Sequence, residues 1–133
     1  MNQSMIMGFD YGTHRIGVAI GQRVTQTASP LAILKARQGQ PNWSEIEALI
    51  KEWQPEAFVV GLPLHMDDEP SDLSVQAEKF ARRLTGRFNL AHTMVDERLS
   101  SVEAKNLSAG DAIDDVAAVL ILETYLSSDS TLT

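Results

Sequence analysis

The segment Ala57–Leu62 (AFVVGL) contains no polar side chain and lies between two stretches with helical periodicity. A short, uninterrupted apolar run of this kind is typical of a strand that is buried on both faces of a parallel sheet. Apolar residues at helical spacing predict one helix over 43–53, with Asn42 or Ser44 as its cap, and another over 73–86. A strand between two helices implies crossover connections, so we predict an α/β sheet.

The N-terminal part of the chain contains two further apolar runs, which predict strands at Met5–Phe9 and Ile16–Gly21 joined by a tight turn. Residues 25–34 predict a third strand, placed at an edge of the sheet because Pro30 interrupts it. The polar residues 35–41 are expected to form a loop. Since a tight turn cannot make a parallel connection, strands two and three are expected to run antiparallel to strand one.

The C-terminal part predicts a fifth strand over 90–95, a short helix over 99–107, a break at 108–110 and a strongly apolar helix over 113–126. Residues 127–133 are expected to be a frayed tail. The predicted fold is therefore a single domain of 133 residues. It has a five-stranded mixed sheet, in which strand two is antiparallel, flanked by helices.

Composition excludes several classes of protein. The chain has no cysteine, so neither a disulfide framework nor a thiolate metal site is possible, and a reducing cytoplasm is the expected compartment. The net charge of −7 argues against a nonspecific nucleic-acid-binding protein, because Lys and Arg supply most of that affinity. No basic leader or apolar stretch of about 20 residues predicts export or a membrane span.

Carboxylates follow the strands at both ends of the predicted fold. Asp10 follows the first strand, Glu97 follows the fifth, and Asp114 or Asp115 opens the last helix. Ligands of α/β sheets collect beyond the carboxyl ends of the parallel strands, so these acids are expected to meet at one edge. Carboxylates without nearby cysteine suit Mg²⁺ or Mn²⁺ better than zinc.

Such a cluster is suited to phosphodiester hydrolysis. Gathered carboxylates repel one another, and a divalent ion reverses that cost. Two ions roughly 3.5–4 Å apart can activate water and stabilise the leaving oxygen of an in-line displacement. Arg15, Arg98 and Lys105 are expected to position backbone phosphates.

Four motifs in order resemble the YqgF family, the Holliday-junction-resolvase-like proteins also described as pre-16S ribosomal RNA nucleases. They are FDYGTHRIGVAIG (9–21), VVGLPLHMD (59–67), DERLSSVEA (96–104) and IDDVAAVLIL (113–122). The resemblance implies a ribonuclease H-like fold with Asp10, Glu97 and Asp114 as the catalytic, metal-binding acids. Similar turns in sugar kinases and actin-like ATPases of the same fold face a phosphate, which makes Thr13 a candidate nucleic-acid contact.

The predicted function is that of a metal-dependent nuclease acting on structured nucleic acid, with maturation of the 5′ end of pre-16S ribosomal RNA as the implied role. Two alternatives stay open: a Holliday junction resolvase acting on branched DNA, and a weakly active nucleic-acid or ribosome-precursor binding module. An actin-like ATPase is disfavoured, because those enzymes close two domains around the nucleotide. The sequence does not choose between RNA and DNA, one and two metal ions, or monomer and homodimer. The resemblance implies a longer, basic segment between Ala104 and Ile113 than the KNLSAGDA found here, and the effect of this departure on substrate binding also stays open.

Overall fold

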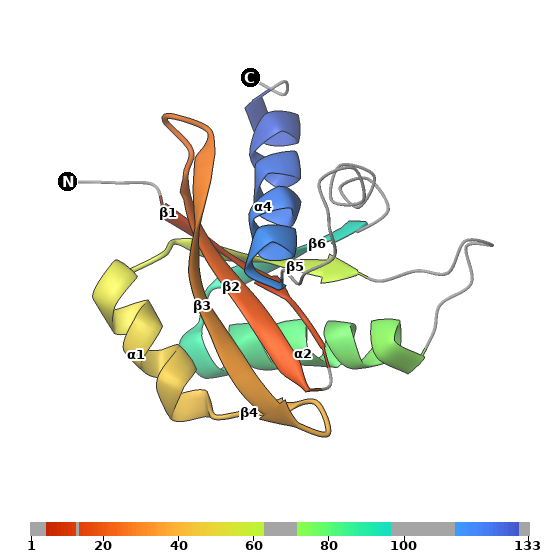
Figure 1. The fold of residues 1–133 in the computed structure, drawn as a ribbon. Helices are drawn as coiled ribbons and strands as arrows, with labels where there is room; N and C mark the ends of the chain where they lie inside the picture. Colours follow the sequence, from red (N-terminus) through yellow and green to blue (C-terminus); the bar gives the residue numbers. More distant parts are fainter. Residues whose placement is uncertain (1–4, 13, 63–71, 97–113, 131–133) are drawn as a thin grey trace.

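A computed structural model describes residues 5–12, 14–62, 72–96 and 114–130 of the chain. The strands form one six-stranded sheet in the order β4-β3-β2-β1-β5-β6 (Figure 1). The strands are β1 (Met5–Asp10), β2 (Arg15–Gln22), β3 (Thr27–Arg37), β4 (Gln40–Pro41), β5 (Ala57–Leu62) and β6 (Ala91–Asp96). The helices are α1 (Trp43–Trp53), α2 (Asp72–Phe88) and α4 (Asp114–Ser130).

The directions of the strands confirm most of the predicted topology. β2 is antiparallel to β1, while β5 is parallel to β1 and β6 is parallel to β5. The apolar run 57–62 forms a strand of the parallel part of the sheet, as predicted, and lies between β1 and β6. The prediction that strand three runs opposite to strand one was wrong. β3 is antiparallel to β2, and two successive reversals of the chain return it to the direction of β1.

The sheet has six strands rather than five, because residues 35–41 do not form a loop. β3 continues to Arg37, and β4 pairs with its end through a two-residue turn made by Gln38 and Gly39. Both turn residues have positive φ, 50° and 81°, as the tight turns that match the twist of a hairpin require. The sequence did not predict this hairpin, because most of its side chains are exposed and therefore polar.

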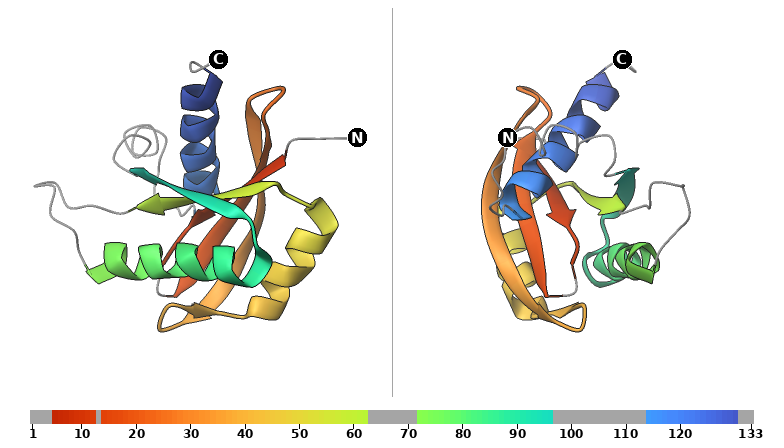
Figure 2. Two further views of the ribbon diagram at one scale, coloured as in Figure 1. Left: turned by 180° about the vertical axis from the view of Figure 1, so that it is seen from behind. Right: turned by 45° about the vertical axis from the view of Figure 1, so that its right-hand side comes forward.

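The helices cover the two faces of the sheet separately, as the two views in Figure 2 show. Residues of α1 and α2, among them Ile46, Phe80 and Leu84, pack with Phe9 and Phe58 in one buried cluster. On the other face α4 forms a second cluster with β1, β2, β5 and β6, whose members are Ile6, Ala19, Val59, Val95, Ala118, Ile121, Leu122 and Leu126. The molecule is thus a three-layer α/β sandwich.

Local signals agree with the helix boundaries. The side chain of Asn42 accepts a hydrogen bond from the Ser44 backbone N–H at 3.0 Å, so Asn42 and not Ser44 caps α1. Trp43 and Trp53 pack against the core, and Trp43 stacks on Phe80 with ring centroids 5.6 Å apart.

Two helices are longer than their apolar patterns. α2 continues two residues past Gly86, and α4 continues to Ser130. Among the helices of the described part of the chain, none is long and apolar enough to cross a membrane. The predicted short helix over 99–107 and the break at 108–110 lie outside the described residues.

Candidate active site

Asp10 is the last residue of β1 and is half-buried. Alternate residues of this strand face opposite sides of the sheet, with Ile6 in the cluster on α4 and Phe9 in the cluster on α1 and α2. Gly8 faces α4 as well, because a Cβ on it would lie 3.1 Å from Cβ of Leu122. By the same alternation Asp10 lies on the α4 face, at the carboxyl end of the strand.

The direction of α4 follows from its contacts with two glycines. A Cβ on Gly21 would lie 3.1 Å from Cδ1 of Leu126, whereas one on Gly8 would lie 3.5 Å from the carbonyl oxygen of Ala118. Gly21 is paired with Ile6, near the start of β1. Moving along β1 toward its carboxyl end therefore means moving along α4 toward its N-terminus.

This antiparallel arrangement brings the start of α4 toward the end of β1. Asp114 opens α4 about one helical turn before Ala118, and Asp10 follows Gly8 by two residues on the same face. Figure 1 shows the first turn of α4, in lighter blue, lying over the sheet while its C-terminal end lies level with the tip of the β2–β3 hairpin. Backbone topology thus directs two of the three predicted acidic positions to one region; the side chain of Asp114 lies outside what is described.

β5 and β6 end together on the same side, since Leu62 is paired with Asp96 and both strands run parallel to β1. Val95 belongs to the cluster under α4. Glu97 comes directly after the last residue of β6 and lies outside the described residues, as do the other predicted contacts Thr13, Arg98 and Lys105. Within the described ranges no group of three metal-ligating side chains occurs. Two of the three predicted ligands have no described side chain.

The turn between β1 and β2 is tight at Gly12. A Cβ at this position would lie 2.6 Å from the carbonyl oxygen of Arg15, closer than any side chain tolerates. Gly12 is therefore explained by the close approach of backbone to backbone. This turn sets the position of Asp10 before it and of Arg15 after it.

Arg15 and Lys35 are cations on the same face of the sheet as Asp10. Asp10 is paired with Gly17, and Arg15 lies two residues earlier in β2, so it shares that face. Arg15 is exposed and is paired across the sheet with Lys35, also exposed. Lys35 was missed by sequence reasoning because it was assigned to a loop. The alternation of Leu34 and Ala36 with Lys35 and Arg37 is the strand signal that could have found it.

Arg23 lies at the other end of β2 and has a structural role. Its Nε donates to Oε2 of Glu56 at 2.7 Å, and its Nη2 donates to the hydroxyl of Tyr125 at 3.2 Å. These contacts join β2 to the start of β5 and to the last turns of α4. Of these two arginines, Arg15 is therefore the one that lies at the β1–β2 turn, next to the end of β1.

Tyr11 directly follows Asp10 but faces the opposite side of the sheet, where it packs on Phe80 with ring centroids 5.1 Å apart. Its hydroxyl donates to the carbonyl oxygen of Gly39 at 2.8 Å. Burial raises the pKa of the Tyr11 hydroxyl above its usual value, and the nearby Arg83 guanidinium partly opposes this rise. The hydroxyl therefore stays protonated and keeps its role as a donor at neutral pH.

Solved structures similar to this chain share its fold. RuvC of Thermus thermophilus, in complex with Holliday junction substrate, superposes with a TM-score of 0.64 at 12% identity, covering 95% of both chains. The Holliday junction resolvase of fowlpox virus gives a TM-score of 0.53 at 15% identity, covering 93% of this chain and 99% of its own. These likenesses confirm the ribonuclease H-like fold that the sequence resemblance implied.

Sequence relatives are much nearer. A protein of Pseudomonas fluorescens named "Putative pre-16S rRNA nuclease" is 51% identical over 138 residues, covering 96% of this chain and 95% of its own. A protein of the same name from Pseudomonas aeruginosa is 53% identical over 132 residues, covering 92% of each. The family model RuvX, described as Holliday junction resolvase, matches residues 4–128. With nearly its whole length matched, the chain belongs to the RuvX family.

Proposed function

We propose that this chain is a nuclease that uses divalent metal ions to hydrolyse phosphodiester bonds in structured RNA, and that it processes the 5′ end of pre-16S ribosomal RNA. The names of its relatives and its family support nucleic-acid hydrolysis. The structural observation that carries the proposal is the approach of the start of α4 to the carboxyl end of β1, where Asp10 ends the strand on the face that α4 covers.

The proposed metal ligands are Asp10, Glu97 and Asp114. The alternation along β6, in which Val95 contacts the α4 cluster, supports position 97 rather than 96 as the next one on that face. The start of α4 supports an acid in its first turn, and the sequence resemblance favours Asp114 over Asp115. Oxygen donors of this kind fit Mg²⁺ or Mn²⁺.

The remaining residues would hold and orient the substrate. Arg15 and Lys35 form a pair of exposed cations on the face of Asp10, where they can contact phosphates next to the scissile one. We propose Thr13, Arg98 and Lys105 as further contacts on the basis of the sequence. A bound divalent ion would supply water activation and neutralise charge that develops on the phosphate.

A second candidate is cleavage of branched DNA. The description of the matching family as Holliday junction resolvase favours it. Of the similar solved structures, RuvC is in complex with Holliday junction substrate, and the fowlpox virus protein is a Holliday junction resolvase. A four-way junction presents strands related by symmetry, so this function suits a homodimer better than a monomer. A cytoplasmic location fits either substrate and the absence of cysteine.

The proposed ligands Glu97 and Asp114 each have a neighbouring acid, Asp96 and Asp115, that serves as a matched control. With Mn²⁺ or Mg²⁺ present, Asp10→Asn, Glu97→Gln and Asp114→Asn should abolish cleavage of a precursor RNA spanning the 5′ end of 16S rRNA. The loss should exceed the roughly 10–100-fold that removal of an outer-sphere partner costs. The neighbours Asp96→Asn and Asp115→Asn should retain activity.

A four-way DNA junction assayed in parallel decides between the two substrates. Faster cleavage of the junction than of the RNA would reject the ribosomal role. Wild-type protein that binds both substrates but cleaves neither would reject the nuclease and leave a binding module. Equal losses in the adjacent-acid variants would reject the assigned ligand set.

A further inference from the structure

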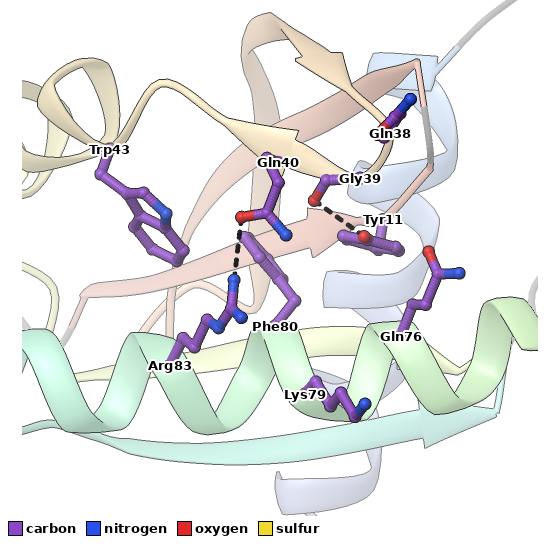
Figure 3. A pocket seen from close by; sticks show the side chains of 9 residues that line it. All are labelled: Tyr11, Gln38, Gly39, Gln40, Trp43, Gln76, Lys79, Phe80 and Arg83. Atoms are coloured by element: carbon purple, nitrogen blue, oxygen red, sulfur yellow. Dashed lines mark hydrogen bonds between the residues drawn. The ribbon is translucent and has the colours of Figure 1, made fainter.

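A pocket of about 180 Å³ lies between the β3–β4 turn and α2, on the side of the sheet away from α4 (Figure 3). Its rim is polar. Gln38 comes from the turn and Gln40 from the start of β4, while Gln76, Lys79 and Arg83 project from α2. Among the described residues no acidic one lines the pocket, although the chain as a whole has a net charge of −7. The pocket is therefore a local site of positive charge.

Its inner wall is aromatic and already packed. Phe80 lies between Tyr11, at a centroid distance of 5.1 Å, and Trp43, at 5.6 Å. The guanidinium of Arg87 lies 4.4 Å from the centroid of the Trp43 ring. Since these rings are engaged with one another and with Arg87, the wall is rigid and ill suited to stacking an inserted base. The groups that remain open to a ligand are the amides and cations of the rim.

The roof of the pocket is fixed by the turn. Gln38 and Gly39 both have positive φ, and the carbonyl of Gly39 accepts the hydrogen bond of Tyr11. A Cβ on Gly39 would collide with the Tyr11 hydroxyl. Position 39 requires glycine because its φ is positive and because a side chain there would collide with Tyr11. The turn therefore fixes the backbone of Gln38 and Gln40 before any ligand binds.

The two cations lack a counter-charge within the described part of the chain. Lys79 and Arg83 are spaced i, i+4 on α2 and both are exposed. Arg83 donates from Nη1 to Oε1 of Gln40 at 2.8 Å, which orients the guanidinium without neutralising it. Neither residue takes part in the ion pairs of the described region. Both cations line the pocket, and an oriented guanidinium and an ammonium are both groups that recognise phosphate.

We infer that this pocket binds a backbone phosphate of the nucleic-acid substrate, away from the scissile bond; the inference rests on the proposed nuclease function. Tyr11 supports the pocket and directly follows Asp10, so the pocket and the candidate catalytic carboxylate lie on opposite faces of the same strand end. A strand that passes around the β1–β2 turn meets Arg15 and Lys35 on one face and Lys79 and Arg83 on the other. The pocket then fixes the register of the substrate relative to Asp10.

The test measures binding without cleavage. Fluorescence anisotropy of a fluorescein-labelled precursor RNA that spans the 5′ end of 16S rRNA, in EDTA and over a range of salt concentrations, compares wild type with Lys79→Gln/Arg83→Gln. Removing both charged hydrogen-bond donors should weaken binding roughly tenfold or more. The slope of log affinity against log salt should fall in magnitude by about 0.7 for each phosphate that the variant no longer neutralises. Arg82→Gln is the matched control, because it removes one charge from an exposed neighbour that does not line the pocket.

The outcomes separate this inference from the proposed function. Unchanged affinity and slope in the double variant overturn the pocket, even if the protein cleaves RNA. An equal effect in Arg82→Gln also overturns it, because general charge and not the pocket would then explain binding. If inorganic phosphate stabilises the wild-type protein but does not compete with RNA for binding, the pocket is a site for small anions, and the inference is overturned as well. The proposed nuclease function is tested separately, by the cleavage assay of Asp10→Asn.

Discussion

The contact of Gly8 with α4 couples the stability of the fold to the candidate active site. A Cβ on Gly8 would lie 3.1 Å from Cβ and 3.4 Å from Cδ2 of Leu122, and 3.5 Å from the carbonyl oxygen of Ala118. Carbon atoms pack best at about 3.5–4.0 Å, so Leu122 has to retreat by at least roughly 0.4 Å. Leu122 is fully buried, and its Cβ moves only with the helix. Gly8→Ala should therefore displace α4 from β1.

The expected cost is that of overpacking a filled core, about 1–3 kcal/mol of unfolding free energy. For a domain of this size that lowers Tm by roughly 3–12 °C. Because α4 carries Asp114 and β1 carries Asp10, the same displacement separates two proposed metal ligands. Misplacement on this scale should reduce kcat by roughly tenfold at a temperature where the variant is fully folded.

Gly86→Ala is the matched control for this variant. Apart from its own helix, no atom lies within 4 Å of a Cβ at Gly86, which is exposed in α2. Removing a glycine from a helix interior should raise stability by about 0.5–1 kcal/mol and leave activity unchanged. Thermal and urea denaturation, followed by initial rates of cleavage, measure both variants. If Gly8→Ala has the same stability and the same cleavage rate as the wild type, the proposed coupling between α4 and β1 is refuted.

Two further predictions concern the β3–β4 turn and the cap of α1. Tyr11→Phe leaves the buried carbonyl of Gly39 without its donor, and urea denaturation should show a loss of about 1–2 kcal/mol. Burial raises the pKa of Tyr11 in the folded protein above its value in the unfolded chain. The stability that the protonated hydroxyl gives to the fold is therefore fully present below about pH 10 and is lost as the pH rises through the folded pKa. Wild type should thus lose stability more steeply than Tyr11→Phe in alkaline titrations, and parallel curves would contradict that sign. Asn42→Ala should cost about 1 kcal/mol of stability through loss of the cap, whereas Ser44→Ala, which removes no capping acceptor, should cost far less; equal losses would show that the cap geometry is wrong.

Much of the fold could be read from hydrophobic periodicity. The uninterrupted apolar run 57–62 predicted the parallel strand β5, because a strand buried on both faces has no polar positions. The helical spacing of apolar residues over 43–53 predicted α1, because a helix buried along one stripe repeats its apolar residues with that spacing. The β3–β4 hairpin escaped because its residues are mostly exposed and polar. Its turn depends on the conformations of Gln38 and Gly39, which composition does not reveal.

For the site, the acids that follow the strands and open the last helix could be read directly from the chain, since they stand out against apolar runs. The antiparallel packing of α4 on β1, which puts its start and Asp10 on one face, and the pairing of Lys35 with Arg15 became apparent from the folded arrangement alone. The pocket over Tyr11 also belongs to the tertiary structure, because it joins residues far apart in the chain, from Tyr11 to Arg83. Side-chain patterns record what each segment buries, whereas the packing of one segment on another depends on contacts that no single segment contains.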